Sequence, residues 1–236
     1  MKLINIVDED FINYKKASMF IITCKCSFKC DKEYGTTICQ NSELAKSQSK
    51  DFDDDYIVDR YMKNDLTEAI VFGGLEPLDQ FDELISLIDK FRKATKDDIV
   101  IYTGYNEDEI RPQINKLCTY KNIIVKFGRF IPNSEHKIDK VLGVELASSN
   151  QYARVLKMSD KKNLKIRQRP IKDESDKILI EKINEGLAKN RQLYGKAYCP
   201  CRIQRKDENV CMCKEFKDQT EPGFCHCGKF EKYYEE

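Results

Sequence analysis

Four short apolar runs mark the first two thirds of the chain. They lie at residues 19–22, 69–72, 99–102 and 123–125, and the last three are followed within a few residues by glycine. Each run is rich in β-branched side chains and lacks polar alternation, which is typical of strands buried on both faces of a parallel sheet. The pattern therefore predicts four strands in this part of the chain.

Helical periodicity fills the intervals between these runs. Asp79 is predicted to cap a helix whose apolar residues recur at spacings of three and four up to Phe91. Two more helices are predicted over residues 54–62 and 107–118, with Pro112 tolerated in the first turn of the second. Strands alternating with helices in this order favour βα units and a mainly parallel sheet.

A second region follows a basic stretch. Residues 157–171 are dense in Lys and Arg and have no sustained apolar period, so they are predicted to be a linker in which 164–166 could form a short strand. Ser175 or Asp176 is then predicted to cap a helix that ends near residues 194–195. The apolar side of that helix carries Leu179, Ile180, Ile183 and Leu187.

Charge and hydropathy exclude some classes of function. The chain has 236 residues, and its 41 Lys and Arg against 40 Asp and Glu give no bulk reason to expect a nucleic acid or an anionic membrane as partner. No apolar run approaches 18 residues, so no transmembrane helix is predicted. Acidic residues near the N-terminus stand where a signal peptide needs an apolar stretch. We expect a cytoplasmic protein.

Cysteine is the unusual feature of the composition. Of the 11 cysteines, six lie between residues 199 and 227 as three Cys-x-Cys pairs, and four lie between residues 24 and 39. In a cytoplasmic chain this density indicates metal or redox chemistry. A tetrahedral zinc or a four-iron cluster uses four thiols, so the second group has two to spare. Two spare thiols beside a cluster could form a disulfide that the cluster reduces.

The second cysteine group resembles a known family. Residues 198–202, Tyr-Cys-Pro-Cys-Arg, and residues 225–228, Cys-His-Cys-Gly, resemble the catalytic subunit of ferredoxin:thioredoxin reductases over about residues 176–236. Met212 stands in the middle pair where that family usually has proline, which removes a rigid turn but no ligand. The resemblance implies a [4Fe–4S] cluster held by four of the thiols, namely Cys199, Cys211, Cys213 and Cys225.

The same resemblance implies a reaction. Cys201 and Cys227 would form the redox-active pair, with Cys201 attacking a target disulfide and His226 supplying a proton. A ferredoxin or flavodoxin would donate the electrons, and a thioredoxin-like or other disulfide protein would receive them. A structural zinc site that uses any four of the six thiols is the alternative.

The first cysteine group points to another family. Cys26 and Cys30 follow a predicted strand, and residues 71–77, Val-Phe-Gly-Gly-Leu-Glu-Pro, resemble the glycine turn of radical S-adenosylmethionine enzymes. Over about residues 15–156 the chain resembles their small activases of anaerobic ribonucleotide reductase. The resemblance implies a [4Fe–4S] cluster and S-adenosyl-L-methionine bound at the turn. The residues it implies are Cys26, Cys30 and Cys39 as ligands and Gly73, Gly74 and Glu76 at the cofactor.

This second resemblance has departures. The family's third cysteine position is occupied by Glu33, so Cys39 or Cys24 would have to complete the site, and Leu75 is inserted in the glycine turn. A cluster that leaves one iron open would bind substrate or cofactor there. A domain that keeps the fold without the chemistry is the alternative.

Taken together, these patterns predict an α/β protein with two domains. A partial, barrel-like and mainly parallel (β/α) sheet is expected over residues 1–156, a linker over 157–175, and a small α-helical iron–sulfur domain over 176–236. The predicted activity is reduction of a protein disulfide, fused to a domain that activates an anaerobic ribonucleotide reductase. The alternatives are a disulfide reductase with an inert N-terminal scaffold, and a zinc- or cluster-stabilised binding module without turnover.

Overall fold

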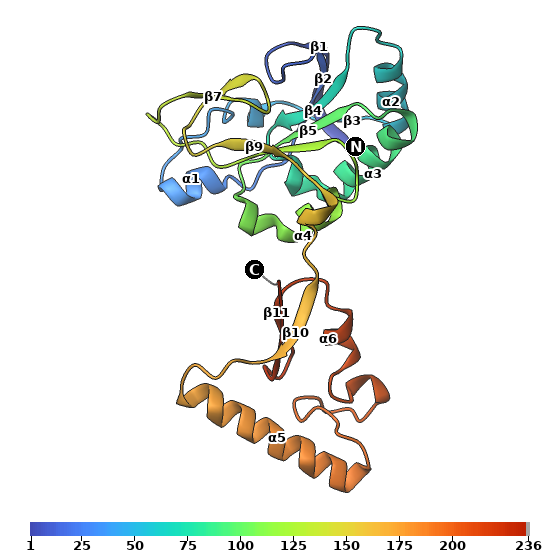
Figure 1. Ribbon diagram of the computed structural model, residues 1–236, viewed down its shortest axis with the longest axis vertical. Helices are drawn as coiled ribbons and strands as arrows, with labels where there is room; N and C mark the ends of the chain where they lie inside the picture. Colours follow the sequence, from blue (N-terminus) through green and yellow to red (C-terminus); the bar gives the residue numbers. More distant parts are fainter. Residues whose placement is uncertain (235–236) are drawn as a thin grey trace. The chain divides into compact units, whose positions relative to one another are not determined.

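The computed structural model describes residues 1–234, which form two compact units (Figure 1). The N-terminal unit spans Met1–Lys161, and the C-terminal unit begins at Lys162. Each unit is described on its own below. Within residues 1–234, no helix is long and apolar enough to cross a membrane.

A seven-stranded sheet organises the N-terminal unit, in the order β3-β1-β2-β4-β5-β6-β9. The four strands β2, β4, β5 and β6 are parallel to one another, and β1 and β9 flank them in antiparallel orientation. These parallel strands coincide with the four predicted apolar runs, which confirms the mainly parallel α/β prediction. The sheet is open between β3 and β9, and its barrel-like curvature stays a prediction. The strands are β1 Lys2–Asp10, β2 Ser18–Thr23, β3 Lys50–Asp51, β4 Ala69–Gly74, β5 Asp98–Tyr102, β6 Ile123–Phe127 and β9 Tyr152–Val155.

Helices α2, α3 and α4 cover one face of this sheet, where their apolar sides contribute to the larger core cluster. The predicted helix over residues 54–62 is confirmed, and the one over 107–118 divides into a 3-10 turn and an α-helix with Pro112 in its first turn. The helices are α1 Lys29–Tyr34, α2 Asp54–Met62, α3 Phe81–Ala94 and α4 Arg111–Leu117. The 3-10 turns are η1 Leu44–Lys46, η2 Pro77–Gln80, η3 Glu107–Ile110 and η4 Met158–Asp160.

The central strands are buried on both faces, which explains their continuous apolar runs. In β4, Ile70 and Phe72 face the helices, whereas Val71 belongs to a second cluster on the opposite face. That second cluster contains Tyr14 and Leu142 and is covered by the hairpin of β7 (Lys137–Asp139) and β8 (Val144–Leu146).

The predicted helix cap at Asp79 is wrong. Helix α3 begins at Phe81 with Gln80 at its N-cap, and Asp79 lies one position earlier, in η2. The Asp79 carboxylate instead accepts hydrogen bonds from the Ser27 backbone N–H and the Tyr105 hydroxyl, each at 2.5 Å. Because the Asp79 carboxylate binds these distant partners, it does not cap the helix. Its bond with Ser27 instead fixes the loop that carries the N-terminal cysteines.

The C-terminal unit, predicted to be helical, also contains a three-stranded antiparallel sheet in the order β10-β12-β11. Strand β10 lies inside the segment predicted to be a linker, and all five of its residues pair with β12. The predicted linker therefore contains regular structure. The strands are β10 Leu164–Gln168, β11 Gly223–Phe224 and β12 Phe230–Tyr234, and the helical segments are α5 Glu174–Tyr194, η5 Asp207–Asn209 and α6 Lys214–Asp218.

Helix α5 begins two or three residues earlier than predicted, because neither Ser175 nor Asp176 is its cap. Asp173 is the N-cap, and its carboxylate accepts a hydrogen bond from the Asp176 backbone N–H at 3.0 Å. Asp176 is instead buried and accepts a 2.6 Å hydrogen bond from Arg169 Nε. The helix ends at Tyr194, as the sequence predicted, and its C-cap Gly195 adopts the left-handed conformation with φ +74°.

Candidate functional site

Five of the six C-terminal cysteines surround one small cavity, which we call the cysteine cavity. Cys199, Cys213 and Cys225 are buried in it, while Cys211 and Cys227 are partly exposed. The cavity is also lined by Met212, His226 and Phe230. Three segments well separated along the chain therefore bring their thiols to one place.

Helix α5 supports the first cysteine pair. A Cβ atom added at Gly186 would lie 2.7 Å from Pro200 Cβ, so only glycine lets the loop approach the helix this closely. The buried Asn190 side chain donates a 2.8 Å hydrogen bond to the Tyr198 carbonyl. Gly186 and Asn190 were not identified from the sequence, because their roles depend on a loop about ten residues further along the chain.

Backbone contacts bring the other two pairs to the first. The Cys199 N–H donates to the Asn209 carbonyl at 2.8 Å, which places the first pair beside the middle pair. At the start of β12, the Phe230 N–H donates to Cys225 Sγ at 3.2 Å. Cys225 Sγ lies 3.5 Å from Cys227 Sγ. Burial raises the pKa of Cys225, and the hydrogen bond from the Phe230 N–H offsets part of that increase.

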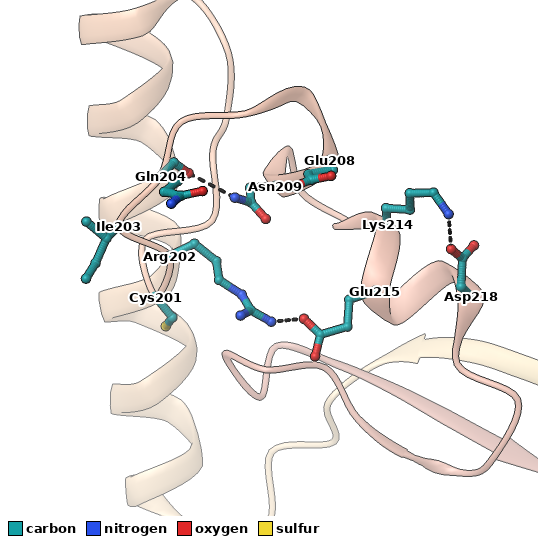
Figure 2. Close-up of a pocket in the computed structure, with 9 residues that line it drawn as sticks. All are labelled: Cys201, Arg202, Ile203, Gln204, Glu208, Asn209, Lys214, Glu215 and Asp218. Carbon is teal, nitrogen blue, oxygen red and sulfur yellow. Dashed lines mark hydrogen bonds and ion pairs between the residues drawn. The ribbon is translucent and has the colours of Figure 1, made fainter.

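Cys201 differs from the other five thiols. Its side chain is exposed and lines a separate pocket of about 530 Å³ (Figure 2), which we call the Cys201 pocket. The one exposed thiol is thus the one that the sequence predicted to attack a substrate.

The thiols influence one another's ionisation. A hydrogen bond with Cys227 lowers the pKa of Cys199, and the same bond together with burial raises the pKa of Cys227. Burial also raises the pKa of Cys201 and that of Cys211. Cys199 therefore favours the thiolate, whereas Cys201 must lose a proton before it can attack a disulfide.

The N-terminal cysteines line another cavity, of about 440 Å³, which we call the N-terminal pocket. Cys26, Cys30 and Cys39 all line it. Cys24 does not; its thiol instead lies 3.3 Å from the Lys2 carbonyl oxygen. Of the two thiols that the sequence left open as a third member, Cys39 is the one that shares the cavity.

Two carboxylates shape the N-terminal cysteine loop. Asp79 holds the Ser27 N–H, and the next residue, Phe28, adopts the left-handed conformation with φ +51° immediately before α1. Asp31 Oδ1 accepts hydrogen bonds from the N–H groups of Ile38 and Cys39, both at 2.9 Å, and so folds Cys39 back toward Cys30. Sequence reasoning missed Asp31, although an acidic residue beside a cysteine is a visible signal.

The glycine turn forms another wall of the N-terminal pocket. Gly73, Gly74 and Glu76 all line it. A Cβ atom at Gly73 would lie 2.8 Å from the Phe20 ring, and Gly74 has φ +87°, so both positions require glycine. The turn brings backbone close to the cavity, at the C-terminal end of β4.

Two buried ionisable groups face this cavity. Glu76 accepts hydrogen bonds from the N–H groups of Gly104 and Leu78, at 2.8 and 3.1 Å, and burial raises its pKa to about 7. Lys126 is only 7% exposed and donates to the Gly128 carbonyl at 3.0 Å, and burial lowers its pKa to about 8. The pocket therefore presents a carboxyl and an amine in a setting of low polarity.

Comparison with known families agrees with both cysteine groups. Residues 15–153, more than half of the chain, match the 4Fe-4S single cluster domain family. The chain belongs to that family. Residues 148–233, which include all six C-terminal cysteines, match the ferredoxin thioredoxin reductase catalytic beta chain. No curated protein and no solved structure matches the chain.

These matches confirm the resemblance to ferredoxin:thioredoxin reductases and identify the N-terminal part as an iron–sulfur domain. Together they support an iron–sulfur oxidoreductase that acts on disulfides and carries a [4Fe–4S] cluster. The radical S-adenosylmethionine resemblance stays a prediction. Within residues 1–234, no three His, Cys, Asp or Glu side chains are gathered closely enough to hold a single metal ion.

Proposed function

We propose that the C-terminal unit reduces a disulfide of a thioredoxin-like or other partner protein, with electrons from a ferredoxin or flavodoxin. The observation that carries this proposal is the division of the six thiols, of which five line the cysteine cavity and Cys201 alone is exposed. In this proposal Cys201 and Cys227 are the redox pair. The match of residues 148–233 supports the donor and the kind of target.

The remaining thiols fit a [4Fe–4S] cluster. We assign Cys199, Cys211, Cys213 and Cys225 as its ligands, because sulfur donors suit iron–sulfur clusters and each of the four lines the cysteine cavity. When bound, such a cluster supplies electrons one at a time to the cysteine pair, which needs two.

The chain's own thiols carry out the exchange. The Cys201 thiolate attacks one sulfur of the substrate disulfide, so that a mixed disulfide forms and one substrate thiolate leaves. The Cys227 thiolate then attacks Cys201 Sγ, which forms the Cys201–Cys227 disulfide and releases the second substrate thiolate. Two electrons and two protons return the pair to its reduced form. His226, exposed at the edge of the cysteine cavity, is positioned to exchange these protons with solvent.

The test separates the pair from the ligands. Cys201→Ser should abolish disulfide reduction with a reduced ferredoxin while the iron content of the unit is kept. Cys211→Ser should lose both activity and iron. Reduction that survives Cys201→Ser would show that the assigned pair is wrong, and zinc without sulfide in the reconstituted protein would leave a binding module without turnover.

A second function is supported by the N-terminal pocket, where Cys26, Cys30 and Cys39 meet Gly73, Gly74 and Glu76. We propose that these thiols hold a second [4Fe–4S] cluster and that the glycine turn binds S-adenosyl-L-methionine, in the activation of an anaerobic ribonucleotide reductase. Cleavage to 5′-deoxyadenosine under anaerobic reducing conditions, lost in Cys26→Ser, is the expected result. No cleavage by fully reconstituted protein would reduce this domain to a scaffold.

A further inference from the structure

Arg169 contacts the turn of the third cysteine pair without lining the cysteine cavity. It lies directly after strand β10, and the thiol exchange proposed above does not use it. We propose that Arg169 is a positioning residue, which holds the turn of residues 225–228 so that Cys227 can attack Cys201 Sγ. This inference rests on the proposed disulfide reductase function. It adds a residue that the cysteine spacing does not identify.

The guanidinium of Arg169 packs against both ends of this turn. Its Cζ atom lies 4.5 Å from the centroid of the Phe224 ring, and Phe224 directly precedes Cys225. At the other end, a Cβ atom added at Gly228 would lie 3.4 Å from Arg169 Nη1. Arg169 therefore contacts the residues on either side of Cys225 and Cys227, and a cation over an aromatic face is an attractive contact.

Arg169 is itself anchored by side-chain and backbone bonds. Its Nε donates a 2.6 Å hydrogen bond to Asp176, which lies in the first turn of α5 and is only 5% exposed. The other oxygen of Asp176 accepts a 3.0 Å hydrogen bond from the Lys172 N–H, so both carboxylate oxygens are fixed. The Arg169 backbone N–H donates to the Lys229 carbonyl at 2.8 Å, directly after the turn. A charge-assisted bond to a buried carboxylate makes this arginine a firm support.

Cys227 depends on such support more than the four proposed ligand thiols do. A bound cluster would fix the ligand thiols, whereas Cys227 must remain free to form and break a disulfide with Cys201. Its position is therefore set by the backbone of the turn, where Gly228 adopts φ +78°, and by the side chains that pack on that backbone. A small displacement of a reacting atom is enough to slow a reaction strongly.

The two thiols of the redox pair are supported separately. The Cys201 loop packs against Gly186 in the middle of α5, whereas Arg169 binds Asp176 in its first turn. A change at Arg169 should therefore leave the attack of Cys201 on a substrate unchanged. It should slow the second step, in which the Cys227 thiolate attacks Cys201 Sγ. In that step the bond between Cys201 and the substrate sulfur breaks, the Cys201–Cys227 disulfide forms, and the second substrate thiolate leaves.

The probe 2,2′-dithiodipyridine separates these two steps, because each step releases one pyridine thione that absorbs light. Full-length reconstituted protein is reduced, freed of reductant without oxygen, and mixed with one equivalent of the probe. Cys227→Ser should release only the first thione. A variant that combines Cys201→Ser with Cys227→Ser gives the release by the remaining thiols, which is subtracted.

The chain offers a matched control for Arg169→Met in Arg167→Met. Arg167 lies in β10, forms a 2.8 Å ion pair with Glu231, and has its Cζ atom 4.2 Å from the centroid of the Tyr233 ring. It therefore makes the same two kinds of contact, but with β12 instead of the turn. A second variant, Arg169→Lys, keeps the charge but lacks the planar group that lies over Phe224.

Arg169→Met should release the first thione at the native rate and the second about tenfold more slowly, because Cys227 is displaced. The mixed disulfide at Cys201 should accumulate and be visible by mass spectrometry after quenching with acid. Arg169→Lys should give a second rate between those of native protein and Arg169→Met. Arg167→Met should match native protein in both steps, and all three variants should keep the native content of iron and sulfide.

The possible failures are distinguishable. If native protein releases no more thione than the double serine variant, or if Cys227→Ser still releases both thiones, the proposed redox pair itself is wrong. If native protein shows both steps but Arg169→Met keeps the native second rate, or slows the two steps equally, only the positioning inference is overturned. Loss of iron from both Arg169 variants, but not from Arg167→Met, would also overturn it, because Arg169 would then support the fold as a whole.

Discussion

The two cysteine groups are built in opposite ways. The N-terminal thiols lie on a short loop that Asp79 and Asp31 tie down beside a sheet with a large core. The C-terminal thiols come from three segments, and the core cluster around them consists of Cys213, Phe216 and Cys225. The first site is attached to a fold whose large core cluster contains none of the four N-terminal thiols. In the second, the cysteines are themselves a large part of what holds the fold together.

The largest expected difference between the groups concerns folding. Cys213→Ser should remove about four iron per chain. The amides of α5 should then exchange faster with solvent, because the small apolar core of this unit cannot replace the cross-link that the cluster provides. Cys39→Ser should leave the amides of β4, β5 and β6 as protected as in native protein. Hydrogen exchange on both variants measures this, and equal protection of α5 in native protein and Cys213→Ser would contradict it.

The next effect concerns the support of the first cysteine pair. Gly186→Ala would favour helix formation by about 1 kcal/mol, but the new Cβ must displace Pro200. We expect disulfide reduction to fall about tenfold, because Cys201 moves with its loop. Glu185→Ala, at the exposed neighbouring position on α5, is the control and should keep the native rate. A native rate in Gly186→Ala would show that the close packing has no role in catalysis.

The N-terminal group should be sensitive to its carboxylates. Asp79→Ala leaves the Ser27 N–H and the Tyr105 hydroxyl without their acceptor, at a cost of about 1 to 3 kcal/mol to the loop. We expect faster loss of iron from the N-terminal site during dilution into chelator, while the C-terminal cluster is kept. The control is Asp82→Ala, an exposed residue in the first turn of α3. Identical rates of iron loss in the two variants would show that the hydrogen bonds of Asp79 do not stabilise the N-terminal site.

The smallest effect is a dependence on pH that belongs to the N-terminal unit. Arg129 donates to both carboxylate oxygens of Glu109, at 2.7 and 2.6 Å, and lowers the pKa of Glu109 to about 2 from its ordinary 4.5. A lowered pKa gives stability that is present above pH 4.5 and is lost as the pH falls toward 2. In the full chain, the N-terminal unit should unfold at a higher temperature in native protein than in Glu109→Gln. This difference in unfolding temperature should narrow from pH 6 to pH 3.

The matched control for this pH effect is Glu43→Gln, whose exposed carboxylate pairs only with Lys46 among the described residues. It should unfold at the native temperature at every pH. If the difference in unfolding temperature between native protein and Glu109→Gln stays constant with pH, the ion pair with Arg129 does not stabilise the fold.

Sequence patterns predicted the strands and helix ends that are determined by residues close together in the sequence. The parallel strands are buried on both faces, so their apolar runs are visible in the sequence, and α5 ends at a glycine that adopts positive φ. Strands β1 and β10 were harder to identify, because they mix buried and exposed positions and carry many charges. The two helix caps were harder to predict, because distant partners decide them. Asp79 does not cap α3, since its carboxylate binds Ser27 and Tyr105, and Asp173 caps α5, since the Asp176 carboxylate binds Arg169.

The site was predictable in its residues but not in its geometry. The Cys-x-Cys spacing identifies all six C-terminal thiols, yet only the fold separates the exposed Cys201 from the five that share a cavity. The third N-terminal thiol needed Asp31 to bring Cys39 back to Cys30. Contacts such as Gly186 with Pro200 join residues that no periodic pattern relates.

The central claim is that the six C-terminal thiols divide into four ligands and one redox pair. The most direct measurement is iron and acid-labile sulfide per chain in full-length protein whose Cys26, Cys30 and Cys39 are all serine, so that only the C-terminal site counts. Adding Cys201→Ser and Cys227→Ser together should leave about four iron and four sulfide. Loss of the cluster from that variant, or its retention when Cys211→Ser is added instead, would contradict the assignment.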